Sequence, residues 1–194
     1  MNIKHTLMAA GALLLATGSA HAGVVEELRV GVMQHNICVT NCKNADKEDG
    51  PSVNLELVFA SPDFLSWAFE PRPYLMASIN TAGDTSFGGG GLEWAFNVTD
   101  SITIEPGLGY VIHNGETSNP FPDGTPQAYD FAQENLLLGS EDLFRTSLGV
   151  HWQFSEKWGA EVLYEHLSHG QILGSGRNQG VDNIGMRISY TFGE

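Results

Sequence analysis

A strict alternation of apolar and polar residues recurs along almost the whole chain after residue 22, and this pattern limits the fold more than any other feature. Successive side chains of a β-strand point to opposite faces, so a period of two predicts strands with one apolar face. No helical period of comparable length accompanies it. The fourth of the eight segments follows the glycine run 88–91. The segments lie at 27–32, 53–59, 72–80, 92–98, 102–112, 144–154, 158–168 and 182–192.

The polar face of these segments separates two all-β architectures that share the pattern. A soluble sandwich or lipocalin-like barrel hides its apolar face inside and carries abundant charge outside, whereas an outer-membrane barrel turns its apolar face to lipid. Here the polar face holds small residues and a few charges of both signs, namely Arg29, Arg145 and Arg187 with Glu93, Glu105, Glu161 and Glu165. Such residues suit a narrow, closed lumen. The pattern therefore favours an eight-stranded antiparallel transmembrane β-barrel of the bacterial outer membrane, although the outward face of 72–80 is left open.

The lengths of the connections agree with this plan. With a periplasmic N-terminus, turns on the periplasmic side should be short and outer loops long. The periplasmic turns 99–101 and 155–157 are short, although 61–71 is longer. The chain ends in the aromatic strand SYTF, and an even number of strands returns it to the periplasm. The long outer loops are predicted at 38–51, 113–140 and 169–182.

The first 22 residues are typical of a secretory signal peptide. Lys4 gives a short basic start, an apolar stretch covers 7–17, and Ala20 and Ala22 mark a cleavage site. We therefore expect a mature outer-membrane barrel of residues 23–194, with 8 basic against 23 acidic side chains and a net charge of −15 instead of −14. Such an acidic chain, without clustered Lys and Arg, argues against nucleic acid as the partner.

Export also permits disulfide bonds, and the only two cysteines of the chain, Cys38 and Cys42, lie in one predicted outer loop. Their close spacing favours a small disulfide-closed loop. A metal site would need further Cys or His ligands, and His35 alone gives little support for one. We therefore predict a disulfide here, with neither a metal ion nor another cofactor.

Three polar side chains fall on the outward, lipid-facing side of the last two strands. By strand parity His166 and Ser168 share the apolar face of 158–164, and Asp182 shares the face of Ile184. Because the two strands are consecutive and antiparallel, Asp182 should lie beside His166 and Ser168. An interfacial polar collar would explain His166 and Ser168 alone, but acid, base and nucleophile together match the needs of a serine esterase.

The residues around this triplet resemble a known family. The segments HLSHG at 166–170 and NQGVD at 178–182, with the final strand GMRISYTF, are similar to the lipid A 3-O-deacylase (PagL) family of outer-membrane barrels. The resemblance implies an enzyme of the outer leaflet that hydrolyses the ester-linked 3-O-acyl chain of lipopolysaccharide lipid A. It also implies a metal-free triad with Ser168 as nucleophile, His166 as general base and Asp182 as the orienting acid.

Two positions depart from the family pattern. The family often has Glu where this chain has Asp182, and the interval from the histidine to the acid is slightly longer here. The family commonly has Asn after the serine, where it helps to form the oxyanion hole, but this chain has His169. We therefore assign the oxyanion hole to the backbone N–H of Gly170, with His169 as an auxiliary group.

Lipid A and the other lipids of the outer membrane are the expected partners, and a homodimer is left open. Outward apolar side chains of the last two strands are expected to form a groove for acyl chains, and basic loop residues are expected to meet the phosphates. Membrane anchoring and solvated surface charge are the alternative roles of these two sets. The sets are Trp158, Val162, Tyr164, Ile184 and Met186 for the groove, and Lys43, Lys47 and Arg177 for the phosphates.

Three other functions stay open for such a chain. A non-enzymatic barrel acting as an adhesin or structural protein would leave lipid A unchanged, and a soluble lipocalin-like carrier would fractionate without detergent. A calcium-dependent outer-membrane phospholipase would lose activity to a chelator. That architecture resembles a larger barrel, which needs more strands than 172 mature residues comfortably supply.

Overall fold

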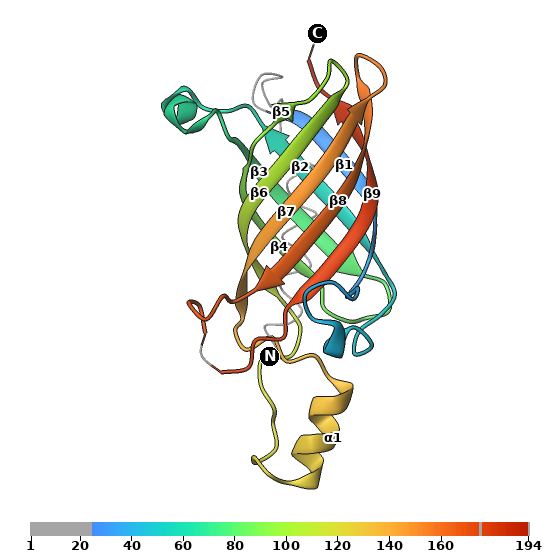
Figure 1. Cartoon of the computed structure of the whole chain (residues 1–194), viewed down its shortest axis with the longest axis vertical. Coiled ribbons are helices and arrows are strands. Elements are labelled where there is room, and N and C mark those ends of the chain that lie inside the picture. Colours follow the sequence, from blue (N-terminus) through green and yellow to red (C-terminus); the bar gives the residue numbers. More distant parts are fainter. Residues whose placement is uncertain (1–24, 175, 194) are drawn as a thin grey trace, which may run out of the picture.

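The computed structural model describes residues 25–174 and 176–193 and shows a closed antiparallel β-barrel (Figure 1). The sheet order is β4-β3-β2-β1-β9-β8-β7-β6-β5, and the pairing of β4 with β6 closes the ring. The strands are β1 (Val25–Gln34), β2 (Pro51–Phe59), β3 (Arg72–Asn80), β4 (Phe87–Glu93), β5 (Phe96–Asn97), β6 (Ile102–His113), β7 (Asp142–Gln153), β8 (Trp158–Ser168) and β9 (Val181–Thr191). The two-residue β5 continues the pairing of β4 with β6, so both form one barrel strand. The predicted eight-stranded barrel is confirmed. The predicted signal segment lies outside the described residues.

The alternation of side chains matches the two faces of the barrel wall. Apolar residues such as Val32 and Met186 are 55% and 67% exposed on the outside, whereas Arg29 in β1 is fully buried inside. In β3, whose outward face the sequence leaves open, Tyr74 is buried in the lumen and Leu75 is 49% exposed. Parity therefore gives the correct face wherever one face carries charge.

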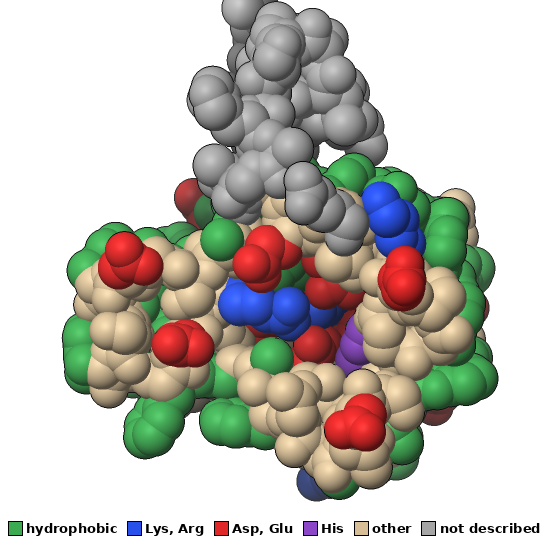
Figure 2. Space-filling view, turned by 90° about the horizontal axis from the view of Figure 1, so that it is seen from above, with side chains coloured by type: hydrophobic (Ala, Val, Ile, Leu, Met, Phe, Trp, Pro, Cys, Tyr) green, Lys and Arg blue, Asp and Glu red, His purple; other side chains and the backbone are tan. Residues whose placement is uncertain are grey.

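Acidic and basic side chains fill much of the lumen, as Figure 2 shows from the end that holds the C-terminus. The guanidinium nitrogens of Arg29 lie 2.8–3.3 Å from carboxylate oxygens of Glu27, Glu56, Glu93 and Glu105. The other two buried arginines pair likewise, Arg187 with Glu161 at 2.6 Å and Arg145 with Glu165 at 2.7 Å. Because charges of both signs are buried together, each offsets the cost of removing the other from water.

Arg29→Met tests the contribution of this network to stability. The variant removes one cation and leaves four neighbouring buried carboxylates with weaker compensation. We expect the free energy of unfolding, measured by urea titration in phospholipid vesicles, to fall by about 3–5 kcal/mol. The control Arg177→Met removes an exposed loop arginine and should change it by less than about 0.5 kcal/mol. An Arg29→Met barrel as stable as the wild type would contradict this account.

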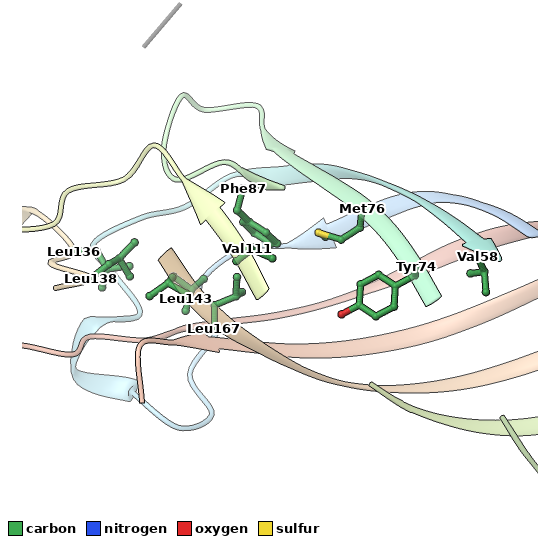
Figure 3. Packing of buried hydrophobic residues seen from close by; sticks show 10 residues of the cluster. Val58, Tyr74, Met76, Phe87, Val111, Leu136, Leu138, Leu143 and Leu167 are labelled. Carbon is green, nitrogen blue, oxygen red and sulfur yellow. The ribbon is translucent and has the colours of Figure 1, made fainter. Parts of the chain in front are cut away.

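A cluster of ten buried apolar residues extends along the lumen from Val58, beside the charged network, to the outer loops (Figure 3). Strands contribute most of it, and Leu136 and Leu138 enter from the loop between β6 and β7. The lumen therefore holds packed side chains from the charged network to the outer loops. The cluster comprises Val58, Tyr74, Met76, Phe87, Val111, Leu136, Leu138, Leu143, Leu167 and Val181.

The structure differs from the prediction at the fourth strand. The glycine run 88–91 lies within β4 and does not precede it, and the strand is interrupted between Glu93 and Phe96. A Cβ atom added at Gly89 or Gly91 would collide with backbone carbonyl oxygens of β6. These glycines therefore allow close approach of two backbones, a role that leaves no alternation of side chains to detect.

The connections include short helices that the sequence pattern does not predict. The long turn 61–71 contains a 3-10 helix, η4 (Asp63–Ala68), which projects beside the barrel with Trp67 81% exposed (Figure 1). At the other end, the loop between β6 and β7 contains α1 (Pro126–Glu134), capped by the Thr125 side chain. A second 3-10 helix, η3 (Cys42–Asn44), lies in the loop between β1 and β2. Among the described residues, no helix is long and apolar enough to cross a membrane.

Candidate active site

The candidate site lies where β8 ends and β9 begins, at the end of the barrel that carries α1 (Figure 1). His166 and Asp182 are register partners in the β8–β9 pair, and Ser168 lies two residues beyond His166 on β8. His166 and Ser168 point outward and are half-buried. Asp182 faces the same side but is only 1% exposed, because the loop after β1 covers it.

Asp182 accepts four hydrogen bonds at its carboxylate. One oxygen, Oδ1, lies 2.7 Å from His166 Nδ1 and accepts a bond of 2.8 Å from the Tyr164 hydroxyl. The other oxygen, Oδ2, accepts from the backbone N–H and from the hydroxyl of Thr40, each at 2.7 Å. The carboxylate is thereby held in one orientation relative to the imidazole.

The contact with Asp182 fixes the protonation pattern of the His166 ring. A carboxylate only accepts hydrogen bonds, so Nδ1 carries the proton that it donates to Oδ1. The second ring nitrogen, Nε2, is then left with its lone pair and can take a proton from a hydroxyl. This is the tautomer that a general base of the Ser-His-Asp type requires.

Ser168 is placed near this base without a recorded bond to it. Residues two apart in a strand project from the same face, about 7 Å apart along the backbone, within reach of an imidazole. Among the described residues, the structure records no hydrogen bond between the Ser168 hydroxyl and His166. Such catalytic hydrogen bonds are often loose before substrate binds.

The loop after β8 holds its shape through His169. The ring is fully buried, its Nδ1 accepts from the Gln171 backbone N–H at 3.1 Å, and its Nε2 lies 3.2 Å from the Arg177 carbonyl oxygen. The backbone N–H of His169 donates to Asn178 Oδ1 at 3.3 Å. The side chain therefore braces the loop, while Gly170 follows at a φ of 61°, in the left-handed region.

Gly180 lies directly against the base. A Cβ atom added there would stand 2.7 Å from His166 Cε1 and 2.8 Å from the Leu167 carbonyl oxygen. Both distances are shorter than packed atoms adopt, so only glycine lets the chain pass the imidazole at this point.

Gly180→Ala should therefore displace the His166 ring. We expect kcat for ester hydrolysis to fall by about 10²-fold, because small misplacements of a catalytic group have effects of that size. Steady-state kinetics on the folded barrel measure the loss, and an unshifted kcat would show that the ring position is unimportant.

The apolar residues predicted to bind acyl chains divide into two groups. Trp158 lies at the other end of β8, ten residues from Ser168, which corresponds to about 33 Å of strand. Ile184 and Met186 follow Asp182 on β9 and line a shallow outward groove of about 530 Å³. The remaining apolar side chains of that groove are Val30, Val32, Ala160 and Ile188.

The three predicted phosphate-binding residues lie in the outer loops. Lys43 and Arg177 are exposed, whereas the Lys47 ammonium donates to the Ala132 carbonyl oxygen of α1 at 2.6 Å. Partial burial and the neighbouring Arg177 guanidinium lower the pKa of Lys47. Lys47 and Arg177 therefore lie close enough for their charges to interact.

Sequence reasoning missed the part that Thr40 plays, and it treated Tyr164 only as an apolar wall. Both hydroxyls donate to Asp182. Closure of the barrel brings the loop after β1 next to the start of β9, so topology could have indicated the neighbourhood. Nothing in the alternation could have indicated the individual side chain, because loop conformation has no period.

The fold and the outward site define a small outer-membrane β-barrel. The model of the family "Lipid A 3-O-deacylase (PagL)" matches residues 98–191, which include β8, β9 and the whole predicted triplet. This segment of the chain is therefore similar to the lipid A 3-O-deacylase family, and the resemblance predicted from the sequence is confirmed. No curated protein sequence matches the chain.

Three solved structures are similar to this chain to different degrees. The crystal structure of the outer membrane enzyme PagL is 16% identical, with a TM-score of 0.55 over 84% of this chain and 97% of that one. The neisserial surface protein A (NspA) is 10% identical, with a TM-score of 0.49 over 88% and 97% of the two chains. Ail of Yersinia pestis is 10% identical, with a TM-score of 0.48 over 87% and 99%.

Proposed function

We propose that this protein is a lipid A deacylase that hydrolyses the ester-linked 3-O-acyl chain through a triad of Ser168, His166 and Asp182. The observation that carries the proposal is the 2.7 Å contact between His166 and the buried Asp182 on the outside of the barrel, beside Ser168. A lumen-facing pair would meet the packed interior, whereas this pair faces the outer-leaflet lipids. The match of residues 98–191 to the lipid A 3-O-deacylase model supports lipid A as the substrate.

The first half of the reaction forms an acyl-enzyme. His166 Nε2 takes the proton of the Ser168 hydroxyl as its oxygen attacks the ester carbonyl. Asp182 stabilises the imidazolium that results. The tetrahedral intermediate then collapses, His166 returns the proton to the sugar hydroxyl that leaves, and the acyl chain stays on Ser168.

The second half regenerates the enzyme. A water molecule gives its proton to His166 Nε2 and attacks the acyl-serine carbonyl. Collapse of the second tetrahedral intermediate breaks the bond to the Ser168 oxygen, which takes the proton back from His166 as the fatty acid leaves. The backbone N–H of Gly170 is our candidate donor to the oxyanion in both halves. The His169 ring is engaged within the loop, so its contribution is to shape that loop.

The surroundings of the site suit a lipid whose head carries phosphates. The groove along Ile184 and Met186 begins two residues from Asp182 and offers an apolar wall to an acyl chain. Arg177 and Lys43 are exposed in the loops above it and can meet phosphate groups. Because the chain as a whole is acidic, apolar contact should contribute most of the capture.

An assay of the purified barrel with two substrates tests the proposal. Lipid A and a phospholipid are incubated in mixed micelles with and without a chelator, and products are identified by mass spectrometry. We expect loss of one ester-linked acyl chain from position 3 of lipid A, unaffected by the chelator. Cleavage of phospholipid that the chelator abolishes would favour a metal-dependent phospholipase, and unchanged lipid A would favour a non-enzymatic barrel.

A further inference from the structure

The loop after β1 contains, near its start, a covalent ring that lies over Asp182. Cys38 and Cys42, four positions apart, form a disulfide, and Thr40 is the middle one of the three residues between them. Two hydrogen bonds to β9 hold the residues that precede the ring. The Ile37 backbone N–H donates to the Asp182 carbonyl oxygen at 2.7 Å, and the Asn36 N–H donates to Asn183 Oδ1 at 3.1 Å.

Thr40 makes three contacts with the acid and base of the site. Its N–H and its hydroxyl both donate to Asp182 Oδ2 at 2.7 Å. Its hydroxyl oxygen also lies 3.2 Å from His166 Nδ1. Because the hydroxyl proton is directed to Asp182, this oxygen can only accept from Nδ1–H. Thr40 therefore orients the carboxylate and shares the proton that the imidazole presents to it.

We propose that Thr40 is a positioning residue of the active site and that the Cys38–Cys42 disulfide holds it there, which makes the activity sensitive to reduction. This inference rests on the triad of the proposed function and deepens it. The two donors fix Oδ2, so that Oδ1 stays directed at His166. Without them the carboxylate can rotate, and the imidazole loses its fixed orientation.

The ring is needed because the segment has little other support. The residues from Cys38 to Asn41 adopt neither helix nor strand, and both cysteines are exposed. A crosslink across so short a segment strongly limits the conformations that the threonine can sample. Exposed cysteines are also open to attack by an external thiol, and reduction of this bond forms two cysteine thiols as two thiols of the reductant become a disulfide.

Substitutions at Thr40 test the positioning role. Thr40→Val keeps the size and the backbone donor but removes the hydroxyl, and we expect kcat to fall about tenfold with KM unchanged. Thr40→Ser restores the hydroxyl and should recover most of the loss. The matched control is Thr81→Val, because the Thr81 hydroxyl also donates in an outer loop, to the Pro51 carbonyl oxygen, but not to Asp182.

Reduction tests the disulfide without any substitution. These two cysteines are the only ones in the chain, so a thiol reductant has a single disulfide target in the protein. We expect reduction of the folded barrel to lower kcat at least as much as Thr40→Val, with recovery on reoxidation. The Cys38→Ser, Cys42→Ser double variant should have the same low kcat and no further response to reductant. Heat-modified electrophoretic mobility checks that each barrel is folded.

Assays with two substrates distinguish a failure of the positioning role from a failure of the proposed function. Each protein is assayed with lipid A and with p-nitrophenyl palmitate, which reports ester cleavage by Ser168 independently of lipid A. A wild type that cleaves only the chromogenic ester, with the same dependence on Thr40 and the disulfide, would overturn lipid A as substrate and support the positioning role. Unchanged kcat after reduction or in Thr40→Val would overturn the positioning role alone. A wild type that cleaves neither ester overturns both proposals.

Discussion

Ser168→Ala is expected to lower kcat for lipid A deacylation by at least about 10⁴-fold, because it removes the oxygen that attacks the ester carbonyl. His166 and Asp182 keep their contact in this variant, since Ser168 takes no part in it. Initial rates of fatty-acid release from lipid A in mixed micelles measure the loss. Ser168 is half-buried on the outside of the barrel, so the substitution should leave the fold intact.

The control for this prediction is Ser101→Ala. Ser101 precedes β6 at the opposite end of the barrel, and the same loss of a hydroxyl there should not change the rate. Deacylation by Ser168→Ala at more than about a hundredth of the wild-type rate would exclude Ser168 as the nucleophile, because removal of a serine nucleophile is expected to cost far more.

Asp182→Asn is expected to lower kcat by about 10⁴-fold, although the new side chain has nearly the same size and shape. An amide nitrogen in place of Oδ1 donates to His166 Nδ1, which then becomes an acceptor. The imidazole proton moves to Nε2, and Nε2 can no longer take the proton of Ser168. The variant should therefore fold and bind lipid A, and only its turnover should fail.

Two further variants make this prediction specific. Asp142→Asn is the matched control, because Asp142 also lies at the outer end of a strand and accepts from a tyrosine hydroxyl, that of Tyr110. We expect it to be as active as the wild type. Asp182→Glu keeps the charge but adds a methylene next to Thr40, so its activity should lie between those of the wild type and Asp182→Asn. Equal activity of Asp182→Asn and the wild type would remove Asp182 from the mechanism.

The strand alternation predicted most of the fold because the barrel has two chemically different sides. Where a strand carries charge on one face, as at Arg29 or Glu161, a shift of one residue would expose that charge to lipid, so parity fixes the facing. The prediction failed at the glycine run 88–91, because glycine has no side chain to alternate. It also missed α1, because a short helix in a long loop is held by caps and local contacts, such as Thr125 with the Ala128 N–H.

The strand positions of the candidate site could also be predicted from the sequence, whereas the loop that covers it could not. Parity and hairpin order brought His166 and Asp182 together, and the structure has them as register partners. The cover over Asp182 was not predictable, because it depends on how one irregular loop folds. Two cysteines in the sequence indicated a ring, but its contact with Asp182 through Thr40 becomes evident only when the barrel closes between β1 and β9.

The folded barrel shows where the acidic side chains of the chain lie. Six buried glutamates face buried or partly buried arginines in the lumen, where their charges are largely offset. Most of the uncompensated negative charge is therefore carried by the loops and turns. An anionic lipid should approach this site more readily as salt screens that charge.

Labelling with a long-chain alkyl fluorophosphonate tests most directly whether Ser168 is an activated nucleophile on the outside of the barrel. The reagent forms a stable adduct with such a serine, and tandem mass spectrometry of the digested protein locates it. We predict a single adduct on Ser168, which blocks lipid A deacylation and forms far more slowly in Asp182→Asn. An adduct on another residue, or a barrel that still deacylates lipid A when Ser168 carries the adduct, would contradict the account.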